Sequence, residues 1–170
     1  MQDIISKDMA SGVRKDPAGL LDRMRVLCSR REYCSSDIMK KLMTALGDRN
    51  EAQKLVDTLV SEKYIDDSRY ASAYARDKAG IAGWGAVKIR YMLMSKGISE
   101  DVVAASLAGI DEDRAASRLH RLLEAKARSL RNDPQRSMKL RRFALSRGYS
   151  YDEAAEAVEG IICKENDDII

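Results

Sequence analysis

The stretch IRYMLMSKGISEDVVAASLAGI, residues 89–110, decides the fold, because its apolar positions recur 51 residues earlier and 51 residues later in the chain. Five apolar columns share this register. They are Ile38/Ile89/Leu140, Leu42/Leu93/Ala144, Ala52/Val103/Ala154, Val56/Leu107/Val158 and Leu59/Ile110/Ile161. Gly47, Gly97 and Gly148 fall near the same phase, where a helix has to stop and turn. A register shared by so many positions indicates three tandem repeats.

The composition favours an all-α protein. Of the 170 residues only two are proline and one is phenylalanine, whereas the residues that favour helices are abundant. No window approaches the roughly 18 uncharged apolar residues of a membrane span. Residues 1–16 lack a basic-then-apolar leader. We therefore expect a cytoplasmic protein with no membrane segment.

Each repeat is predicted to contain three helices, as in tandem helix-turn-helix-like units. The predicted helices span 17–31, 35–46 and 50–63, then 67–81, 84–96 and 99–109, then 111–131, 134–147 and 150–162. The corresponding domains are repeat 1 at 17–64, repeat 2 at 65–110 and repeat 3 at 111–162. Residues 1–16 form an N-terminal segment, for which disorder is one reading, and residues 163–170 form an acidic tail.

Residues at several predicted boundaries suit helix ends. Pro17 and Pro134 fit a first helical turn, where a missing N–H costs nothing. Ser99 and Ser150 offer N-cap hydroxyls ahead of acids that favour the positive end of a helix, and Ser35 does so less completely.

The size of the repeats predicts the architecture. A three-helix unit of about fifty residues has a small core and is marginal alone. Packing between neighbours should therefore give an elongated, curved array, which exposes a long face to a partner.

Charge is distributed unevenly along the chain, although 30 Lys and Arg nearly balance 27 Asp and Glu. Between Arg114 and Arg147 eleven basic residues accompany only two acids, whereas residues 151–170 hold seven acids and one lysine. The basic stretch predicts a surface for an anionic partner, either nucleic acid or an acidic protein groove. A solvated face with unpaired charge is the open alternative.

The sequence contains no recognisable catalytic constellation. It lacks a phosphate-binding loop, a dinucleotide fingerprint, a zinc-protease motif and a calcium loop, so we expect no enzyme activity and no cofactor. Gly80, Gly83 and Gly85 precede Lys88 with a spacing that favours a flexible connector over an anion site. His120 lies on a basic helix, where a solvated or phosphate-facing role is favoured over general-base catalysis.

Other reactive residue types have structural interpretations. Asp66 and Asp67 directly precede a predicted helix, so capping is favoured over acid–base chemistry. Cys28, Cys34 and Cys163, with a single histidine in the chain, do not suffice for a usual structural zinc site and are interpreted as reduced thiols.

Four blocks of sequence follow one another in a recognisable order. They are Ser29-Arg30-Arg31-Glu32-Tyr33-Cys34-Ser35 with Ile38, Lys41 and Leu42; Tyr64-Ile65-Asp66-Asp67-Ser68-Arg69-Tyr70-Ala71; Gly85, Ile89, Arg90, Leu93 and Lys96-Gly97-Ile98; and Lys139, Leu140, Phe143, Leu145 and Arg147-Gly148-Tyr149-Ser150. In order and spacing, from about Leu27 to Ile161, these blocks resemble the RecX family of bacterial recombination regulators. Cys34 and the turn Asp48-Arg49-Asn50 depart from the family pattern, which leaves the local loop geometry open.

The resemblance implies a non-enzymatic modulator of the RecA recombinase. Such proteins bind in the groove of the helical RecA–DNA filament, where they block its extension and lower ATP hydrolysis and strand exchange in DNA repair and the SOS response. We therefore expect a monomer that binds the RecA filament, with single-stranded or double-stranded DNA as a further candidate partner. Basic residues of all three repeats are the candidate partner-binding or DNA-binding side chains: Arg30, Arg31, Lys88, Arg90, Lys96, Arg118, Arg121, Lys139, Arg141, Arg142 and Arg147.

A helix-turn-helix-type protein that acts directly on duplex or single-stranded DNA is the alternative, because units of this kind place a helix in the major groove. The predicted helices lack a concentration of Asn, Gln and Arg at base-reading positions, which weighs against this alternative. A structural adaptor for some other partner is a third interpretation.

Overall fold

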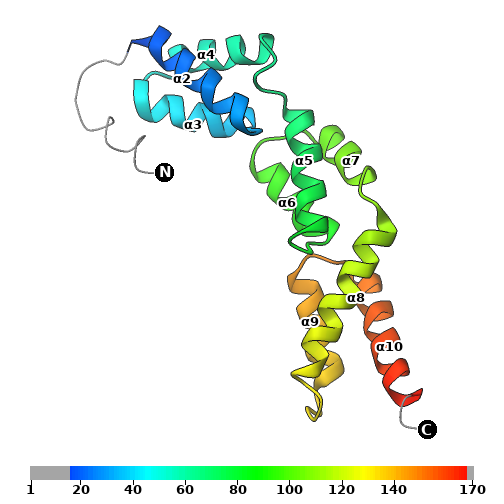
Figure 1. The fold of residues 1–170 in the computed structure, drawn as a ribbon. Coiled ribbons are helices and arrows are strands. Elements are labelled where there is room, and N and C mark those ends of the chain that lie inside the picture. The colour runs from blue at the N-terminus through cyan, green and yellow to red at the C-terminus, as the bar shows by residue number, and fades with distance from the viewer. Residues whose placement is uncertain (1–15, 168–170) are drawn as a thin grey trace. The chain divides into compact units, whose positions relative to one another are not determined.

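The computed structural model describes residues 16–167, which form helices joined by short loops, with no strand among them (Figure 1). The helices are α2 (Pro17–Arg30), α3 (Ser35–Leu46), α4 (Arg49–Ser61), α5 (Asp67–Gly80), α6 (Ala86–Ser95), α7 (Glu100–Ala108), α8 (Glu112–Arg128), α9 (Arg136–Ser146) and α10 (Tyr151–Asp167). The prediction of an all-α fold is confirmed, and each predicted helix has its counterpart.

Helix α10 continues to Asp167, beyond the predicted end at residue 162, so the first part of the predicted acidic tail is helical. The predictions for residues 1–15 and 168–170 lie outside the described residues. No described helix has the length and apolar character needed to cross a membrane.

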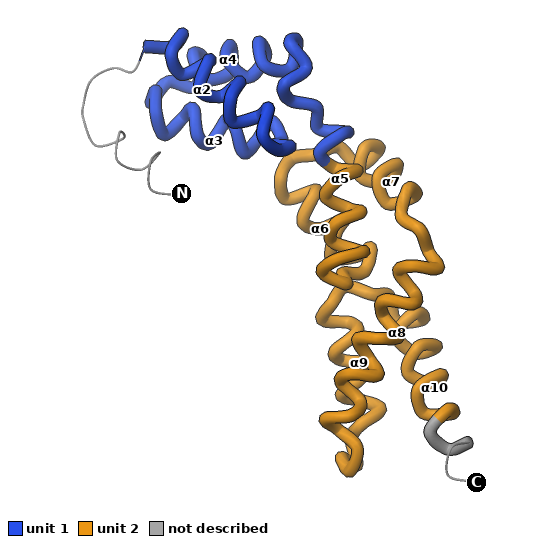
Figure 2. The backbone as a smooth tube through the Cα atoms, viewed as in Figure 1, with its two compact units in different colours: residues 1–70 blue, residues 71–170 orange. Residues whose placement is uncertain are grey.

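The chain divides into two compact units, residues 1–70 and residues 71–170 (Figure 2). Helices α2, α3 and α4 belong to the first unit and α6 to α10 to the second, while α5 begins in the first and continues in the second. Each unit has a hydrophobic core of its own.

The first unit packs α2, α3 and α4 around the apolar columns of the first repeat. Ile38, Leu42 and Leu59 are fully buried, and Val56 is 3% exposed. Leu20 brings α2 onto the same core. Burial of each large aliphatic side chain contributes roughly 1.5–3 kcal/mol to folding, so these few positions account for much of what holds the helices together.

The second unit buries most column positions of the second and third repeats. Fully buried are Ile89, Leu93, Val103, Leu140, Ala144 and Val158. Leu107 and Ile110 are only half-buried, and Ile110 lies beyond the end of the nine-residue helix α7. Ser106 is buried on α7, and its hydroxyl donates to the Val102 carbonyl at 2.7 Å. All five register positions are therefore buried in the first and third repeats, and three of the five are buried in the second.

Several helix ends agree with the prediction. Pro17 lies in the first turn of α2, next to the Asp16 side chain that caps this helix. Ser150 and Glu153 cap α10 reciprocally: the Ser150 N–H donates to Glu153 Oε2 at 2.6 Å, and the Glu153 N–H donates to Ser150 Oγ at 3.2 Å. Left-handed glycines follow the second helix of each repeat, with φ of 69° at Gly47, 78° at Gly97 and 86° at Gly148.

The predicted N-cap hydroxyls of Ser99 and Ser35 and the predicted place of Pro134 in a first helical turn are wrong, although α3 begins at residue 35 as predicted. Ser99 is the N-cap residue of α7, but its side chain makes no capping hydrogen bond. Ser35 is the first residue of α3, and Cys34 takes the N-cap position. Pro134 lies in a turn before α9, because the Asp133 carboxylate holds this turn by accepting from the Gln135 N–H at 2.9 Å.

Candidate partner-binding surface

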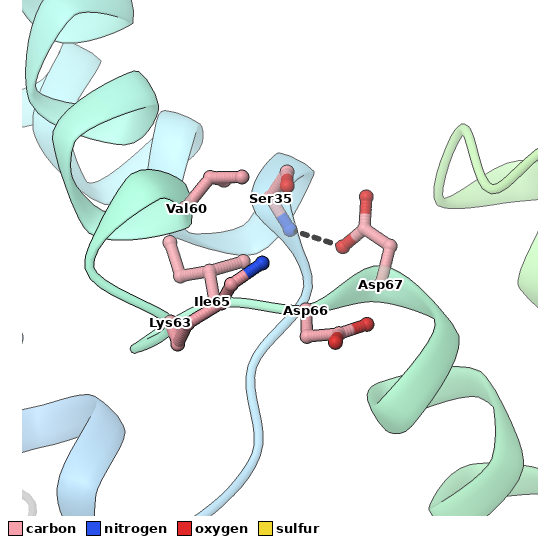
Figure 3. A pocket seen from close by; sticks show the side chains of 6 residues that line it. All are labelled: Ser35, Val60, Lys63, Ile65, Asp66 and Asp67. Carbon is pink, nitrogen blue, oxygen red and sulfur yellow. Dashed lines mark hydrogen bonds between the residues drawn. The ribbon is translucent and has the colours of Figure 1, made fainter.

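The two adjacent aspartates at the start of α5 are engaged by backbone N–H groups. Asp66 Oδ1 accepts from Ser68 and Arg69 at 2.9 and 3.0 Å, and the Arg69 hydrogen bond is the main cause that lowers the pKa of Asp66. Asp67 Oδ1 accepts from the N–H of Ser35 at 2.7 Å (Figure 3). Capping by Asp66 is therefore confirmed, while Asp67 fixes the start of α3.

A shallow pocket lies beside these aspartates in the first unit (Figure 3). It is lined by Ser35, Val60, Lys63, Ile65, Asp66 and Asp67. Since both carboxylates already accept backbone N–H groups, the pocket offers no pair of uncommitted acids for acid–base chemistry.

The glycine-rich segment before α6 forms a joint with the end of α9, within the second unit. The N–H of Gly85 donates to the Arg147 carbonyl at 2.9 Å, and the N–H of Val87 donates to the Gly148 carbonyl at 3.1 Å. Main-chain hydrogen bonds thus connect the second and third repeats directly.

Glycine is required at this joint because the two backbones approach so closely. A Cβ at Gly85 would lie 2.2 Å from the Gly148 carbonyl oxygen, and a Cβ at Gly148 would lie 2.6 Å from the Lys88 nitrogen. Gly83 is also packed, since a Cβ there would lie 2.4 Å from a methyl group of Leu122. The prediction of a flexible connector is therefore wrong. The anion-site alternative also lacks support, because the Gly85 N–H is already bonded to the Arg147 carbonyl.

Two of the predicted binding residues reinforce the joint. Arg147 Nη1 donates to the Ala82 carbonyl at 2.8 Å, and Arg118 Nη2 donates to the Ile81 carbonyl at 2.9 Å. Both arginines therefore have a structural role within the second unit, whether or not they also contact a partner.

The other predicted binding residues differ in how far they are engaged. Engaged side chains are Lys88 with the Trp84 ring at 4.5 Å, Arg31 with the Tyr33 ring at 4.4 Å, Arg90 with Glu100, Lys139 with Asp133, Arg141 with Glu159 at 4.0 Å, and Arg121 with the Ser117 carbonyl at 3.3 Å. Lys96 is half-buried. Arg30 and Arg142 are exposed, and they make no ion pair within the described residues. Partner contact by any of these side chains stays a prediction.

The sequence reasoning missed a set of exposed apolar side chains on α6 and α9. Val87, Tyr91 and Met94 of α6 are 58%, 71% and 45% exposed, and Met138 and Leu145 of α9 are 40% and 41% exposed. The register of 51 residues relates Val87 to Met138 and Met94 to Leu145. The repeat of apolar residues at these positions is visible in the sequence. It can be distinguished from the repeat of core residues only when the buried side of each helix is known.

These features define a class of protein. The described chain is built from short three-helix repeats, its paired aspartates cap and position helices, and its exposed basic and apolar side chains lie along helices. It is a tandem three-helix-repeat protein.

Comparison with known proteins gives the family. The RecX second three-helix domain matches residues 66–107, and the RecX third three-helix domain matches residues 112–158. A regulatory protein RecX from Chromohalobacter salexigens is 32% identical over 141 residues, which cover 81% of this chain and 88% of the relative. The chain belongs to the RecX family.

Further relatives support the same membership. A regulatory protein RecX from Clostridium botulinum strain Alaska E43 is 37% identical over 116 residues, which cover 66% of this chain and about half, 54%, of that relative. A crystal structure of regulatory protein RecX has a TM-score of 0.76 at 26% identity, covering 85% of this chain and 71% of the other. RecX from Lactobacillus salivarius also has a TM-score of 0.76, at 18% identity over 89% of this chain and 99% of the other, and shows the fold alone.

Proposed function

We propose that this protein binds RecA and RecA–DNA filaments and inhibits or modulates recombinase activity in DNA repair and the SOS response. The observation that carries the proposal is its membership of a family of regulatory proteins, with a match that covers most of the chain. We place it in the cytoplasm as a monomer without catalytic activity.

The structure supports this proposal through its repeats. Several three-helix repeats in one chain can make several modest contacts with a filament, and linked contacts raise affinity above that of any single one. Exposed cations such as Arg30 and Arg142 would make the binding sensitive to salt. Where DNA phosphates are contacted, the logarithm of affinity should fall by about 0.7–0.9 per phosphate for each unit of log salt.

Inhibition of DNA-stimulated ATP hydrolysis by RecA tests the proposal. The hydrolysis rate is measured as increasing amounts of this protein are added to RecA on single-stranded DNA. We expect the rate to fall and then to level off as filament sites fill. An unchanged rate, together with no detectable binding to the filament, would contradict the proposal.

Direct DNA binding is the second candidate function, and the basic residues of α8 and α9 favour it. Binding to bare duplex and bare single strands is compared with binding to recombinase-coated DNA at one salt concentration. Tight, sequence-selective capture of bare duplex would favour direct DNA recognition, whereas preference for the coated strand favours the filament.

A further inference from the structure

Exposed large apolar side chains of the second unit concentrate on two helices. Within the described part of residues 71–170, five of seven such residues lie on α6 and α9, and the other two are Ile81 and Tyr151. On α6, Val87, Tyr91 and Met94 follow a spacing of four and three residues, which places them on one face of the helix. Large exposed apolar groups gathered on one face mark interaction sites more often than scattered ones do.

The same positions recur on the equivalent helix of the next repeat. Adding 51 to the three α6 positions gives Met138, Arg142 and Leu145 of α9, all exposed. We call these six residues the α6/α9 stripe: Val87, Tyr91, Met94, Met138, Arg142 and Leu145. The second and third repeats therefore present one set of positions twice.

The first repeat has polar side chains at two of the three equivalent positions and buries the third against its core. The first-repeat equivalents are Ser36, Lys40 and Met43 of α3. Lys40 is exposed, and Met43 packs against the core of the first unit. Because α3 forms its helix without an exposed apolar face there, the stripe in the second and third repeats requires a reason other than folding.

The two helices that carry the halves of the stripe meet at one end of each. The start of α6 is hydrogen-bonded to the end of α9 through Gly85 and Val87, and Figure 1 shows the two helices following one another along the second unit. Gly85 leaves no room for a side chain at this contact, which keeps the start of α6 close to the end of α9.

The charge of the stripe indicates what covers it. Neither α6 nor α9 contains an acidic residue. Arg142 stands between Met138 and Leu145, is exposed, and has no ion pair to any described residue. A complementary surface therefore combines apolar side chains with carboxylates. Nucleic acid supplies anions but no aliphatic surface for valine, methionine and leucine, whereas a protein supplies both.

We propose that the α6/α9 stripe is the docking surface for a protein partner that presents acidic and apolar side chains together, one contact to each of the two repeats. This inference rests on the proposed function, since the recombinase filament is the partner expected to fill the role. Tyrosine and arginine are enriched among the residues that dominate protein interfaces, so Tyr91 and Arg142 should carry most of the affinity.

Two matched pairs of variants test the stripe. Tyr91→Ala is compared with Tyr151→Ala, because these tyrosines are 71% and 64% exposed in the same unit. Arg142→Glu is compared with Arg76→Glu on α5, which makes the same charge change at another exposed position. The readouts are affinity for RecA on single-stranded DNA, affinity for bare DNA, sedimentation behaviour, and the thermal unfolding midpoint.

We expect Tyr91→Ala and Arg142→Glu each to weaken filament binding about tenfold. Their thermal unfolding midpoints should match those of their controls. Tyr91→Ala should leave the affinity for bare DNA unchanged. If the wild-type protein does not bind the filament, the proposed function fails and this inference fails with it. If it binds and Tyr91→Ala behaves like Tyr151→Ala, only the inference is overturned. If Tyr91→Ala weakens binding to bare DNA as much as binding to the filament, the stripe binds nucleic acid. If the wild-type protein sediments as a dimer and Tyr91→Ala as a monomer, the stripe binds a second copy of the chain. Both results overturn the proposal.

Discussion

A single missing side chain at Gly85 sets how closely the second and third repeats can meet. Its φ of −78° is open to any residue, so the requirement for glycine comes from the backbone of Gly148 and Tyr149. The nearest atom, the Gly148 carbonyl oxygen, lies 2.2 Å from where a Cβ would be. Gly85→Ala should therefore destabilise the second unit by about 1–3 kcal/mol through overpacking against rigid backbone. Urea unfolding, followed by circular dichroism, measures the effect.

Gly80→Ala is the matched control for this variant. Gly80 ends α5, and a Cβ there would meet nothing within 4 Å, so alanine should be neutral or stabilise by up to about 1 kcal/mol. Equal unfolding midpoints for the two variants would show that the joint yields without cost.

The sequence shows the cluster of glycines but does not predict the backbone contact that requires one of them. The spacing of Gly80, Gly83 and Gly85 is visible in the sequence, and it excluded a known phosphate loop. The contact that explains Gly85 is made with Arg147 and Gly148, some sixty residues later. A local sequence pattern cannot reveal a steric restriction that is imposed by backbone far away in the chain.

At the scale of the element, helix α5 depends on a cap that was visible in the sequence. Asp66→Ala removes the acceptor for two backbone N–H groups and should cost about 0.5–2 kcal/mol of stability. Asp66→Asn keeps an acceptor at this position and should cost less. The free energy of unfolding in urea at pH 7 distinguishes the three proteins.

The same residue predicts a dependence on pH. Folding lowers the pKa of Asp66, so the ionised carboxylate stabilises the fold above its unfolded pKa of about 3.9. That stability is lost as the pH falls through the lower folded pKa. Between about pH 4 and pH 2 the unfolding free energy of Asp66→Asn should therefore decline less steeply than that of the wild type. Parallel curves would contradict this assignment.

The group that fixes a helix start could be predicted where it is local and not where it is distant. Asp16, Asp66 and Ser150 all cap within a few residues along the chain. The start of α3 is fixed instead by Asp67, whose carboxylate reaches the Ser35 N–H from 32 residues away. The local Ser-x-Asp pattern at residues 35–37 predicts a cap by Ser35, but the Ser35 side chain does not cap α3.

At the scale of the whole molecule, the separate cores predict that damage to one unit spares the other. Leu140 is fully buried in the second unit, and Leu140→Asp would place an unpaired charge there. We expect α8, α9 and α10 to lose protection in amide hydrogen exchange, followed by α6 through the joint. Helices α2, α3 and α4, which have their own core, should stay protected.

Leu145→Asp controls for the charge itself, since Leu145 lies on the same helix but is 41% exposed. Its exchange pattern should resemble that of the wild type. Loss of protection in all helices of Leu140→Asp would show that the two units unfold as one.

Much of the molecular plan follows from the period of 51 residues. Ile38, Ile89 and Leu140 are all fully buried, so the register located the same core position three times. The period did not separate the buried side of a helix from its exposed side, because Val87 and Met138 repeat as faithfully as Ile89 and Leu140 do. Only the packing of each unit distinguishes the two sides, and the α6/α9 stripe therefore became apparent with the structure.

The joint at Gly85 and Gly148 also decides how the protein can be cut for study. A fragment starting at residue 111 would lose the amides that serve the Arg147 and Gly148 carbonyls, and a fragment ending at residue 110 would lose those carbonyls. Either cut leaves backbone hydrogen-bonding groups without their partners, and such fragments should tend to aggregate. The smallest piece that keeps this contact whole runs from α5 to the end of α10, so the second and third repeats should be expressed, crystallised and titrated as one body.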